Sequence, residues 1–410
     1  MIALRRIFVS LANRNYRIWA IGALISNIGS WMQRTAQDWI VLTELTQHNA
    51  TAVGIVMGLQ FAPQILLLPL TGHAADHLDR RKLLVCTQAA MGLFALGLGL
   101  LVVTGLVRLW HVYVFAFLLG CAAAFDAPAR QTFVTQLVEP ALLTNAVGLN
   151  STSFNAARMV GPAIAGLVIA AVGSGYVFLI NAVSFVAVLA ALAMLRLDEP
   201  ASGSRPASRS GLADGFRYVL GRPDLRLVLS MLFLIGTFGL NFPICISAMA
   251  VKVFHVGAGQ FGLLTSMMAA GSVTGALLAA ARAKPSIALL AVAAAMFGMT
   301  CAAAALAPVY LAFGLILFAV GAAAQTFTTS TNSLTQLTTA PAMRGRVIAI
   351  LMAIALGGTP IGAPIVGWVA DQFGPRWALG VGAAAGILAA AIAAIYLAGR
   401  RAAQPDAGTA

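Results

Sequence analysis

The chain has 410 residues, of which 60% are hydrophobic and only 9% are charged, and its mean hydropathy is +0.91. An average globular protein has about 25% charged residues, so this chain has too little polar surface to cover its apolar side chains in water. The composition therefore excludes a soluble enzyme, a secreted disulfide-bonded domain and a disordered chain. It indicates a protein that crosses a membrane several times.

Apolar runs of about twenty residues recur along the chain, as at 83–105 and 174–196. This length crosses the hydrocarbon core as a helix, whereas a strand of a membrane barrel alternates apolar and polar residues. We therefore predict an all-α membrane protein with twelve spans. In chain order the predicted spans are residues 18–42, 52–75, 83–105, 109–128, 146–171, 174–196, 225–250, 259–281, 286–306, 309–330, 346–369 and 376–398.

Basic residues predict the orientation of these spans. Of the 25 lysines and arginines, 20 lie on the side of the two termini, and the opposite loops hold only Arg108, Lys252 and Arg376. The positive-inside rule then places both termini in the cytoplasm. The net charge of +13 is explained by this topology and by contact with anionic lipid head groups, so we expect no nucleic-acid partner.

A polar stretch divides the predicted spans into six and six. Residues 197–224 are rich in Ser, Pro, Gly and Arg, which predicts a cytoplasmic linker, with a short interfacial helix at 211–220. The expected domains are residues 1–196 and 225–410. The halves share AAA at 122–124 and 322–324 and TQL at 135–137 and 335–337, which favours an internal repeat of the kind found in secondary transporters.

No motif indicates an enzyme, a cofactor or a metal site. The chain has no G-x-x-x-x-G-K-[ST] loop and no G-x-S-x-G turn, and His73 and His77 lack the glutamate of a H-E-x-x-H site. We therefore expect no catalytic residues, no metal and no ATP-driven pump.

Ionisable residues inside predicted spans point to function, because charges in lipid are costly and usually face a cavity. Arg34 and Asp38 lie one helical turn apart in the first span, and Asp38 is the only carboxylate clearly within a span. Burial disfavours the charged carboxylate and the arginine favours it. We predict Asp38 as the proton-coupling acid with Arg34 as its partner, and a purely structural ion pair at the outer mouth fits equally well.

Other polar and aromatic residues within the spans are candidates for a substrate cavity. Arg158, near the middle of the fifth span, fits the binding of an anionic substrate group, a counter-charge or a structural hydrogen bond. Hydrogen bonds between helices are the alternative for the rest. The C-terminal half has almost no buried charge, so we expect coupling in the N-terminal half. The remaining cavity candidates are Asn27, Trp31, Gln33, Gln60, Gln64, Asn155, Asn241 and Gln325.

The loop at 72–82, GHAADHLDRRK, closely resembles the signature loop of the major facilitator superfamily, G-x-L-a-D-r-x-G-r-r-k. Ala74 replaces the usual Leu and Asp79 replaces the second Gly. The resemblance implies that Asp76 faces the N-terminus of the eleventh span, near Arg346, and latches the halves in the outward-facing state. A solvated loop acid is the alternative. The expected latch comprises Gly72, Asp76, Arg80, Arg81, Asp126 and Arg130, with Arg80 pairing with Asp126.

Further stretches at 15–38, 125–137, 155–166 and 361–376 resemble the branch of that superfamily that contains bacterial enterobactin exporters and macrolide efflux proteins. Gly161, Pro162 and Gly166 resemble the antiporter motif G-P-x-x-G-G, which implies a hinge and a seal, with ordinary packing of a kinked helix as the alternative. Gly358 and Pro360 predict a similar kink in the eleventh span.

The resemblance implies a two-bundle exporter in the bacterial inner membrane that alternates access and is driven by proton entry. We expect a monomer that exports a small amphipathic molecule, such as a siderophore or a drug. An uptake carrier for a small polar nutrient, an uncoupled facilitator, and a channel or membrane scaffold are the alternatives. The apolar second half argues against a sugar carrier.

Overall fold

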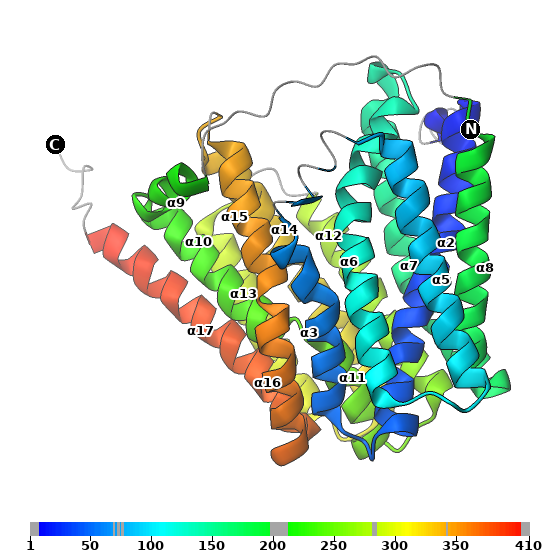
Figure 1. The fold of residues 1–410 in the computed structure, drawn as a ribbon. Helices are drawn as coiled ribbons and strands as arrows, with labels where there is room; N and C mark the ends of the chain where they lie inside the picture. The colour runs from blue at the N-terminus through cyan, green and yellow to red at the C-terminus, as the bar shows by residue number, and fades with distance from the viewer. Residues whose placement is uncertain are drawn as a thin grey trace. The chain divides into compact units, whose positions relative to one another are not determined.

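The computed structural model describes residues 8–68, 70–71, 74, 78–196, 212–280, 285–341 and 343–402. Every regular element in these residues is helical (Figure 1). Ten of the described helices are long and apolar enough to cross a membrane. The protein is therefore an all-α, multi-pass membrane protein.

Two further helices complete the first part of the chain. The helix α2 (Arg14–Ile40) has 27 residues but carries several polar side chains, and the apolar helix α3 (Ala50–Leu66) has 17 residues. Neither is among the ten. The predicted count of twelve spans depends on these two helices and stays a prediction.

The chain folds into two compact units. One comprises Met1–His48, Leu59–Pro206 and Val256–Ser266, and the other comprises Asn49–Gly58, Ala207–His255 and Met267–Ala410. Each unit therefore contains a short segment from the other half of the sequence. The start of α3 belongs to the second unit, and the start of α12 (Ala258–Ala280) belongs to the first.

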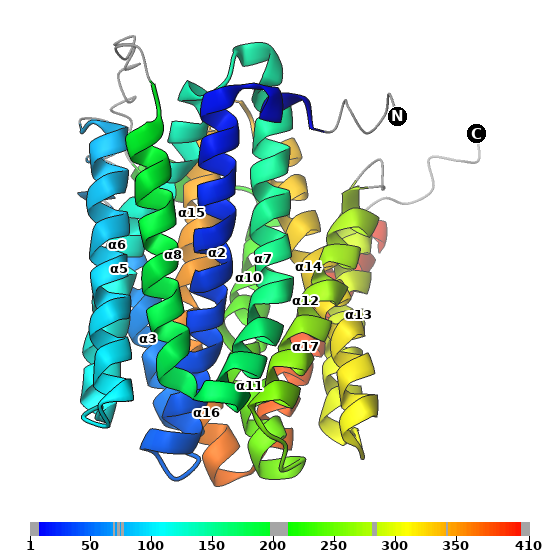
Figure 2. The ribbon, with the colours of Figure 1, turned by 90° about the vertical axis from the view of Figure 1, so that its right-hand side faces the viewer.

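In the first unit, α8 (Ser174–Met194) packs against both α2 and α5 (Arg80–Val103), and α7 (Leu143–Val172) lies along α2 (Figure 2). Small residues allow this close approach, because a Cβ added at Gly22 of α2 would lie 2.7 Å from the Cβ of Ala191 in α8. Side chains cap the helix starts: Asn13 accepts from the N–H groups of Asn15 and Tyr16. The helix α6 (Leu109–Phe133) of this unit packs against α5.

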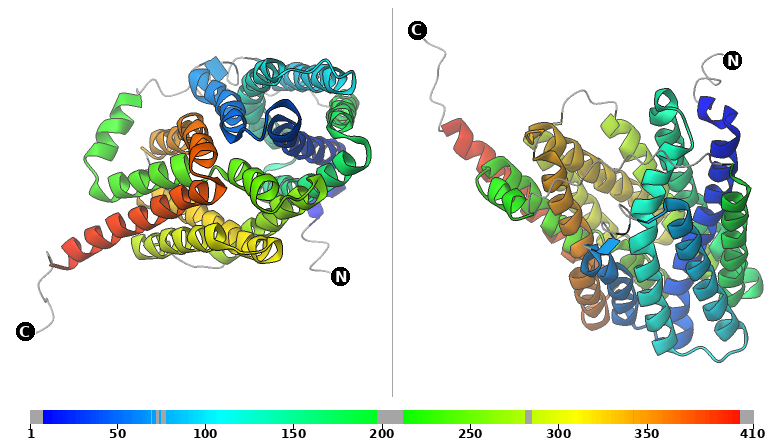
Figure 3. Two further views of the ribbon diagram at one scale, coloured as in Figure 1. Left: turned by 90° about the horizontal axis from the view of Figure 1, so that it is seen from below. Right: turned by 45° about the horizontal axis from the view of Figure 1, so that its top comes forward.

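In the second unit, α13 (Ile287–Leu306) packs against α14 (Tyr310–Thr338) and α17 (Pro375–Ala402). The pairing of α13 with α17 is visible in Figure 3. The short helix α9 (Leu212–Leu220) confirms the predicted helix, and its position at the membrane interface stays a prediction. The other helices of the second unit are α10 (Pro223–Leu234), α11 (Phe242–Ala248), α15 (Arg344–Gly357) and α16 (Thr359–Gln372).

Two predicted spans of this unit are broken. The seventh consists of α10, a π-helical turn at Ile235–Gly239, α11 and a second π-helical turn at Met249–Val253. The eleventh breaks at Gly358, between α15 and α16, where Pro360 stands in the first turn of the new helix. The predicted kink in that span is confirmed, since proline cannot donate a hydrogen bond to the preceding turn.

Candidate functional site

One face of α2 carries polar and charged side chains. The spacings of four, three and four residues place them above one another along the helix. All four side chains are half-buried, and two of them, Arg34 and Asp38, are charged, which is unusual in an apolar helix bundle. These residues are Asn27, Trp31, Arg34 and Asp38.

Arg34 lies against aromatic rings. Its Cζ atom is 5.1 Å from the ring centroid of Trp31 and 5.7 Å from that of Phe61 on α3. Within the described residues no carboxylate oxygen lies within 4.0 Å of its guanidinium. Arg34 and Asp38 are therefore neighbours one turn apart, and the guanidinium is held by cation–π contacts. Proton coupling by Asp38 stays a prediction.

Arg158 is a second arginine inside the first unit, on α7. Its Nε and Nη2 atoms are buried and have no hydrogen-bond partner among the described residues. The neighbouring Asn155 donates its side-chain amide to the carbonyl of Ser151, 2.9 Å away. The ring of Phe154 packs edge-on against Trp31, with centroids 5.7 Å apart. The structure thus places Trp31 of α2 against Phe154 of α7, next to Asn155 and one turn before Arg158.

The predicted hinge residues lie where α7 meets two other helices. A Cβ added at Gly161 would lie 2.7 Å from the Cβ of Trp31. Further along, Gly166 lies against the backbone of Ala258, and the carbonyl of Pro162 abuts Gly262 in α12. Small residues are therefore required here for close packing. Their role as a hinge stays a prediction.

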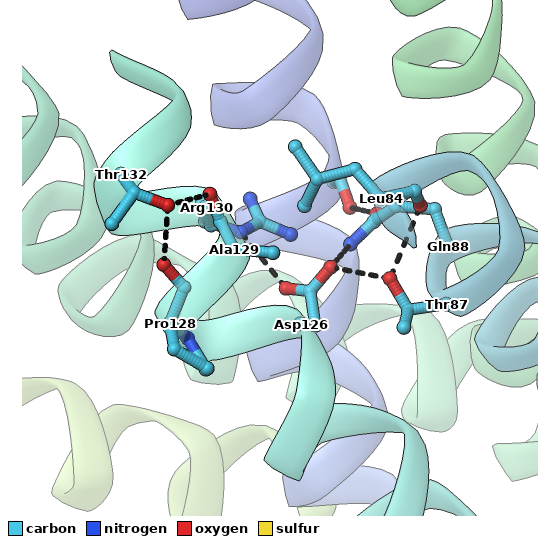
Figure 4. Close-up of polar contacts among 9 residues, drawn as sticks. Leu84, Thr87, Gln88, Asp126, Pro128, Ala129, Arg130 and Thr132 are labelled. Atoms are coloured by element: carbon cyan, nitrogen blue, oxygen red, sulfur yellow. Dashed lines mark hydrogen bonds and ion pairs between the residues drawn. The ribbon is translucent and has the colours of Figure 1, made fainter. Parts of the chain in front are cut away.

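Asp126 forms a buried network between α5 and α6 (Figure 4). Its Oδ1 accepts hydrogen bonds from Thr87 Oγ1 at 3.0 Å and Gln88 Nε2 at 2.5 Å. Its Oδ2 accepts from Arg130 Nε at 3.0 Å, in an ion pair across one helical turn. The expected pairing of Arg80 with Asp126 is wrong, because the carboxylate is held by Arg130.

The other latch candidates have different surroundings. Arg80 begins α5 and is half-buried. Arg81 donates from Nη2 to the carbonyls of Leu192 and Ala193, at 2.6 and 3.2 Å, so it caps the C-terminal end of α8. Gly72 and Asp76 lie outside the described residues.

The remaining cavity candidates make mainly helix contacts. Gln33 accepts a hydrogen bond from Asn181 at 2.6 Å, between α2 and α8. Asn241 is buried and donates to the carbonyl of Thr237 at 2.7 Å, across the break before α11. Gln60 is half-buried on α3, and its backbone carbonyl lies against Gly120 of α6.

The second unit contains a charged cluster that the sequence did not predict. Asp371, near the end of α16, accepts from the N–H groups of Ala50 and Thr51 at 2.8 and 2.7 Å, and from Thr51 Oγ1 at 2.6 Å. It also pairs with Lys252 Nζ at 2.7 Å. Asp371 therefore caps the start of α3 across 320 residues of sequence.

This cluster corrects two expectations. The predicted eleventh span ends at residue 369, which leaves Asp371 in a loop, whereas α16 continues to Gln372. Asp126 and Asp371 lie in two of the ten described helices that are long and apolar enough to cross a membrane, whereas α2, which carries Asp38, is not among the ten. The C-terminal half also holds a partly buried ion pair. The sequence feature that could have indicated this cluster was Asp371 itself, within the stretch 361–376.

Comparison with known proteins identifies the family. A family model described as transmembrane secretion effector, within the major facilitator superfamily, matches residues 7–407. The chain belongs to this family. The resemblance seen in the loop at 72–82 is thereby confirmed over almost the whole chain.

Relatives of this chain include siderophore and drug transporters. A staphyloferrin A transporter of Staphylococcus aureus is 27% identical over 356 residues, which cover 85% of this chain and 87% of that protein. The multidrug efflux pump Tap of Mycolicibacterium fortuitum is 27% identical over 371 residues, covering 86% and 88%. The enterobactin exporter EntS of Citrobacter koseri is 24% identical over 342 residues, covering 82% and 80%.

Several solved structures share the fold of this chain. The nucleoside transporter NupG has a TM-score of 0.75 at 13% identity, covering 93% of this chain and 100% of that chain. A bacterial homologue of the human lysosomal transporter Spinster, in an inward-facing and unoccupied conformation, has a TM-score of 0.71 at 14% identity, covering 94% and 96%. At these identities the likeness shows the fold alone.

Proposed function

We propose that the protein exports a small amphipathic molecule, siderophore-like or drug-like, by alternating access and in exchange for protons. The observation that carries this proposal is the polar face of α2, where Arg34 and Asp38 stand half-buried in an apolar bundle. Ionisable groups at such depth usually line a path for substrates or ions. The names of the relatives support an export or siderophore-transport function.

The proposed architecture has twelve spans in two six-helix bundles, residues 1–196 and 225–410, joined by the linker at 197–224. In this arrangement α2 and α3 join the ten long apolar helices as spans. The basic residues favour termini in the cytoplasm and a location in the bacterial inner membrane. The protein would act as a monomer and would need no cofactor and no catalytic residues.

Alternating access requires contacts between the two halves of the sequence that can open. Two sets of close contacts have the required character, since each joins a helix of one half to a helix of the other. The first turns of α3 pack on α16, where Gly54 lies against Ala363 and Gly58 against Pro360. The second set joins α7 to α12 around Gly166 and Gly262. We assign both sets to the gate that opens and closes during transport.

In the proposed cycle Asp38 carries the proton and Arg34 holds the adjacent charge. Asp126 with Arg130, together with Gly72, Asp76, Arg80 and Arg81, would stabilise one of the two access states. The network around Asp126 supports this role, because a buried carboxylate with three partners fixes the relative position of α5 and α6.

The proposal is tested with inside-out membrane vesicles energised to an acidic lumen. Staphyloferrin A, enterobactin, a macrolide and a cationic dye are added one at a time, and proton leak is recorded with a pH-sensitive fluorophore. We expect at least one compound to release protons from vesicles that contain the wild-type protein. The Asp38→Asn variant, inserted at equal amount, is expected to show no such leak.

The outcomes separate the parts of the proposal. A leak that persists in Asp38→Asn would retain exchange but move the coupling acid, with Asp126 the next candidate. Transport of a labelled compound without proton leak would contradict exchange and favour an uncoupled facilitator. Accumulation of a polar nutrient against its gradient in whole cells would favour an uptake carrier.

A further inference from the structure

Among the described residues of the first unit, Arg158 has more buried charged nitrogen atoms without a hydrogen-bond partner than any other side chain. An arginine stays protonated in proteins, and its buried nitrogen atoms normally find acceptors. Its Nε and Nη2 nevertheless have none in the described residues. An unpaired charge within a membrane helix is costly, so its presence indicates a partner that is not part of the described chain.

No carboxylate among the described residues of the first unit supplies that partner. Asp126 is paired with Arg130, Asp79 caps α5, and Glu44 accepts from Ser174 at 2.7 Å. Among the described residues no acid lies within 4.0 Å of the Arg158 guanidinium. The local excess of positive charge is therefore open to an external anion.

Aromatic rings and a second arginine stand beside Arg158. Phe154, one turn earlier on α7, packs against Trp31, and its side chain is still 46% exposed. Arg34 lies on the Trp31 ring at 5.1 Å. Because a Cβ at Gly161 would lie 2.7 Å from the Cβ of Trp31, α2 and α7 touch within one turn of Arg158. Arg34 thus lies on one of the two paired rings, and Arg158 follows the other ring by one turn of α7.

We propose that this arginine–aromatic cluster, formed by Trp31, Arg34, Phe154 and Arg158, binds the anionic end of an amphipathic cargo. Guanidinium groups recognise carboxylates through paired hydrogen bonds, and exposed aromatic rings accommodate an apolar or aromatic body next to that anion. The inference rests on the proposed transport function and narrows its substrate class to organic anions. Cationic drugs are disfavoured at this cluster by like-charge repulsion.

An anionic lipid head group could offer the same chemistry as a cargo anion. We assign the cluster to cargo, because Arg158 lies within the long helix α7, about 15 residues from either end, and not at a membrane interface. A competition arm in the experiment separates the two sources.

The test uses purified protein in nanodiscs of zwitterionic lipid and two fluorescent probes. Pyrenebutyrate carries a carboxylate, and pyrenebutanamide has the same aromatic body without the charge. Binding is measured by fluorescence anisotropy for the wild type, Arg158→Gln and Arg158→Lys. Arg108→Gln is the matched control, because Arg108 is exposed at the start of α6.

The wild type and Arg108→Gln are expected to bind pyrenebutyrate about tenfold more tightly than the amide, which is typical of one charge-assisted contact. Arg158→Gln should lose this preference, while Arg158→Lys should recover part of it because the charge is kept. Equal binding of the two probes, or a preference that survives in Arg158→Gln, overturns the proposal. Displacement of pyrenebutyrate by added phosphatidylglycerol overturns the assignment to cargo.

A transport arm distinguishes this inference from the proposed function. Proteoliposomes are loaded with pyrenebutyrate, pyrenebutanamide or a cationic dye, and protein-dependent efflux is followed. Preferential efflux of pyrenebutyrate supports the inference. Efflux of the amide or the dye without preference for the acid retains export and refutes the anion class, whereas absence of efflux together with tight acid binding refutes the transport function alone.

Discussion

The contact of Asp371 with the start of α3 gives a quantitative test of how the second unit holds α3 on α16. The carboxylate receives four hydrogen bonds of 2.6–2.8 Å, three from Ala50 and Thr51 and one from Lys252. Asp371→Ala removes all four. The α3 segment at 50–58 should then open to water more often.

The magnitude follows from the interactions that this substitution removes. Replacing a helix-capping side chain by alanine costs about 1 kcal/mol. A fully buried ion pair costs about 3–5 kcal/mol to break, but the side chains of Asp371 and Lys252 are 17% and 24% exposed, so about 1–2 kcal/mol is appropriate here. The total of about 2–3 kcal/mol corresponds to an increase of about 30-fold to 150-fold in the open population.

A series of milder substitutions separates the helix cap from the ion pair. Asp371→Asn keeps an acceptor that caps helices as well as aspartate does, so it should lose only the ion pair, about 1 kcal/mol. Lys252→Met should have a similar effect, because it removes the same pair. The double variant should cost little more than either single change, since the two residues share one interaction.

Hydrogen–deuterium exchange of peptides covering residues 50–58, in nanodiscs, measures the opening. Asp79→Asn is the matched control: Asp79 caps α5 by accepting from the Lys82 N–H at 2.7 Å, away from α3. Unchanged exchange in Asp371→Ala, or equal acceleration at 50–58 in Asp79→Asn, would refute the assigned role of Asp371.

Three further predictions concern the first unit. Asp126→Ala should lower the stability of the protein by about 3 kcal/mol, because it leaves Arg130 partly buried without its carboxylate, and a thermal unfolding scan would show the shift in Tm. Gly161→Ala should reduce folded yield and transport, since the new methyl would lie 2.7 Å from the Cβ of Trp31, whereas Gly148→Ala on the same helix meets nothing within 4 Å and should be tolerated. Asp38→Asn should abolish cargo-dependent proton leak while leaving cargo binding in place, which vesicle fluorescence and a binding assay on the same preparation would show.

Continuous apolar runs were sufficient to predict the ten described helices that are long and apolar enough to cross a membrane. Because the membrane demands about twenty apolar residues for each crossing, the predicted span at 174–196 differs from α8 by only two residues. The prediction for the fourth span was less accurate. It ended at Pro128, but α6 continues to Phe133, where the ion pair of Asp126 with Arg130 supports the last turns.

The partners of the polar residues could not be predicted in the same way. Hydropathy has no information about which helices meet, so the cap of α3 by Asp371 was invisible in the sequence. The same limitation explains the wrong partner for Asp126. Arg80 was chosen by its place in a family motif, whereas Arg130 is the residue that helix geometry puts one turn away. Family likeness identified the fold, but the contacts had to come from the structure.

The proposed anionic cargo constrains how Asp38 couples transport to protons. Asp38 stands two turns beyond Trp31 on α2, about 10 Å along the axis. If Asp38 carries one proton inward for each anion that leaves, the two movements transfer charge in the same electrical sense, so the membrane potential drives the proposed exchange together with the pH gradient.

An anion leaving a negatively charged cytoplasm gains about 2.3 kcal/mol for each 100 mV of membrane potential, and the entering proton gains the same amount. We therefore expect efflux of pyrenebutyrate from proteoliposomes to continue when the pH gradient is collapsed and an inside-negative potential is kept with potassium and valinomycin. Efflux that stops with the pH gradient would show that no net charge crosses the membrane, which would refute export of the free anion in exchange for a proton.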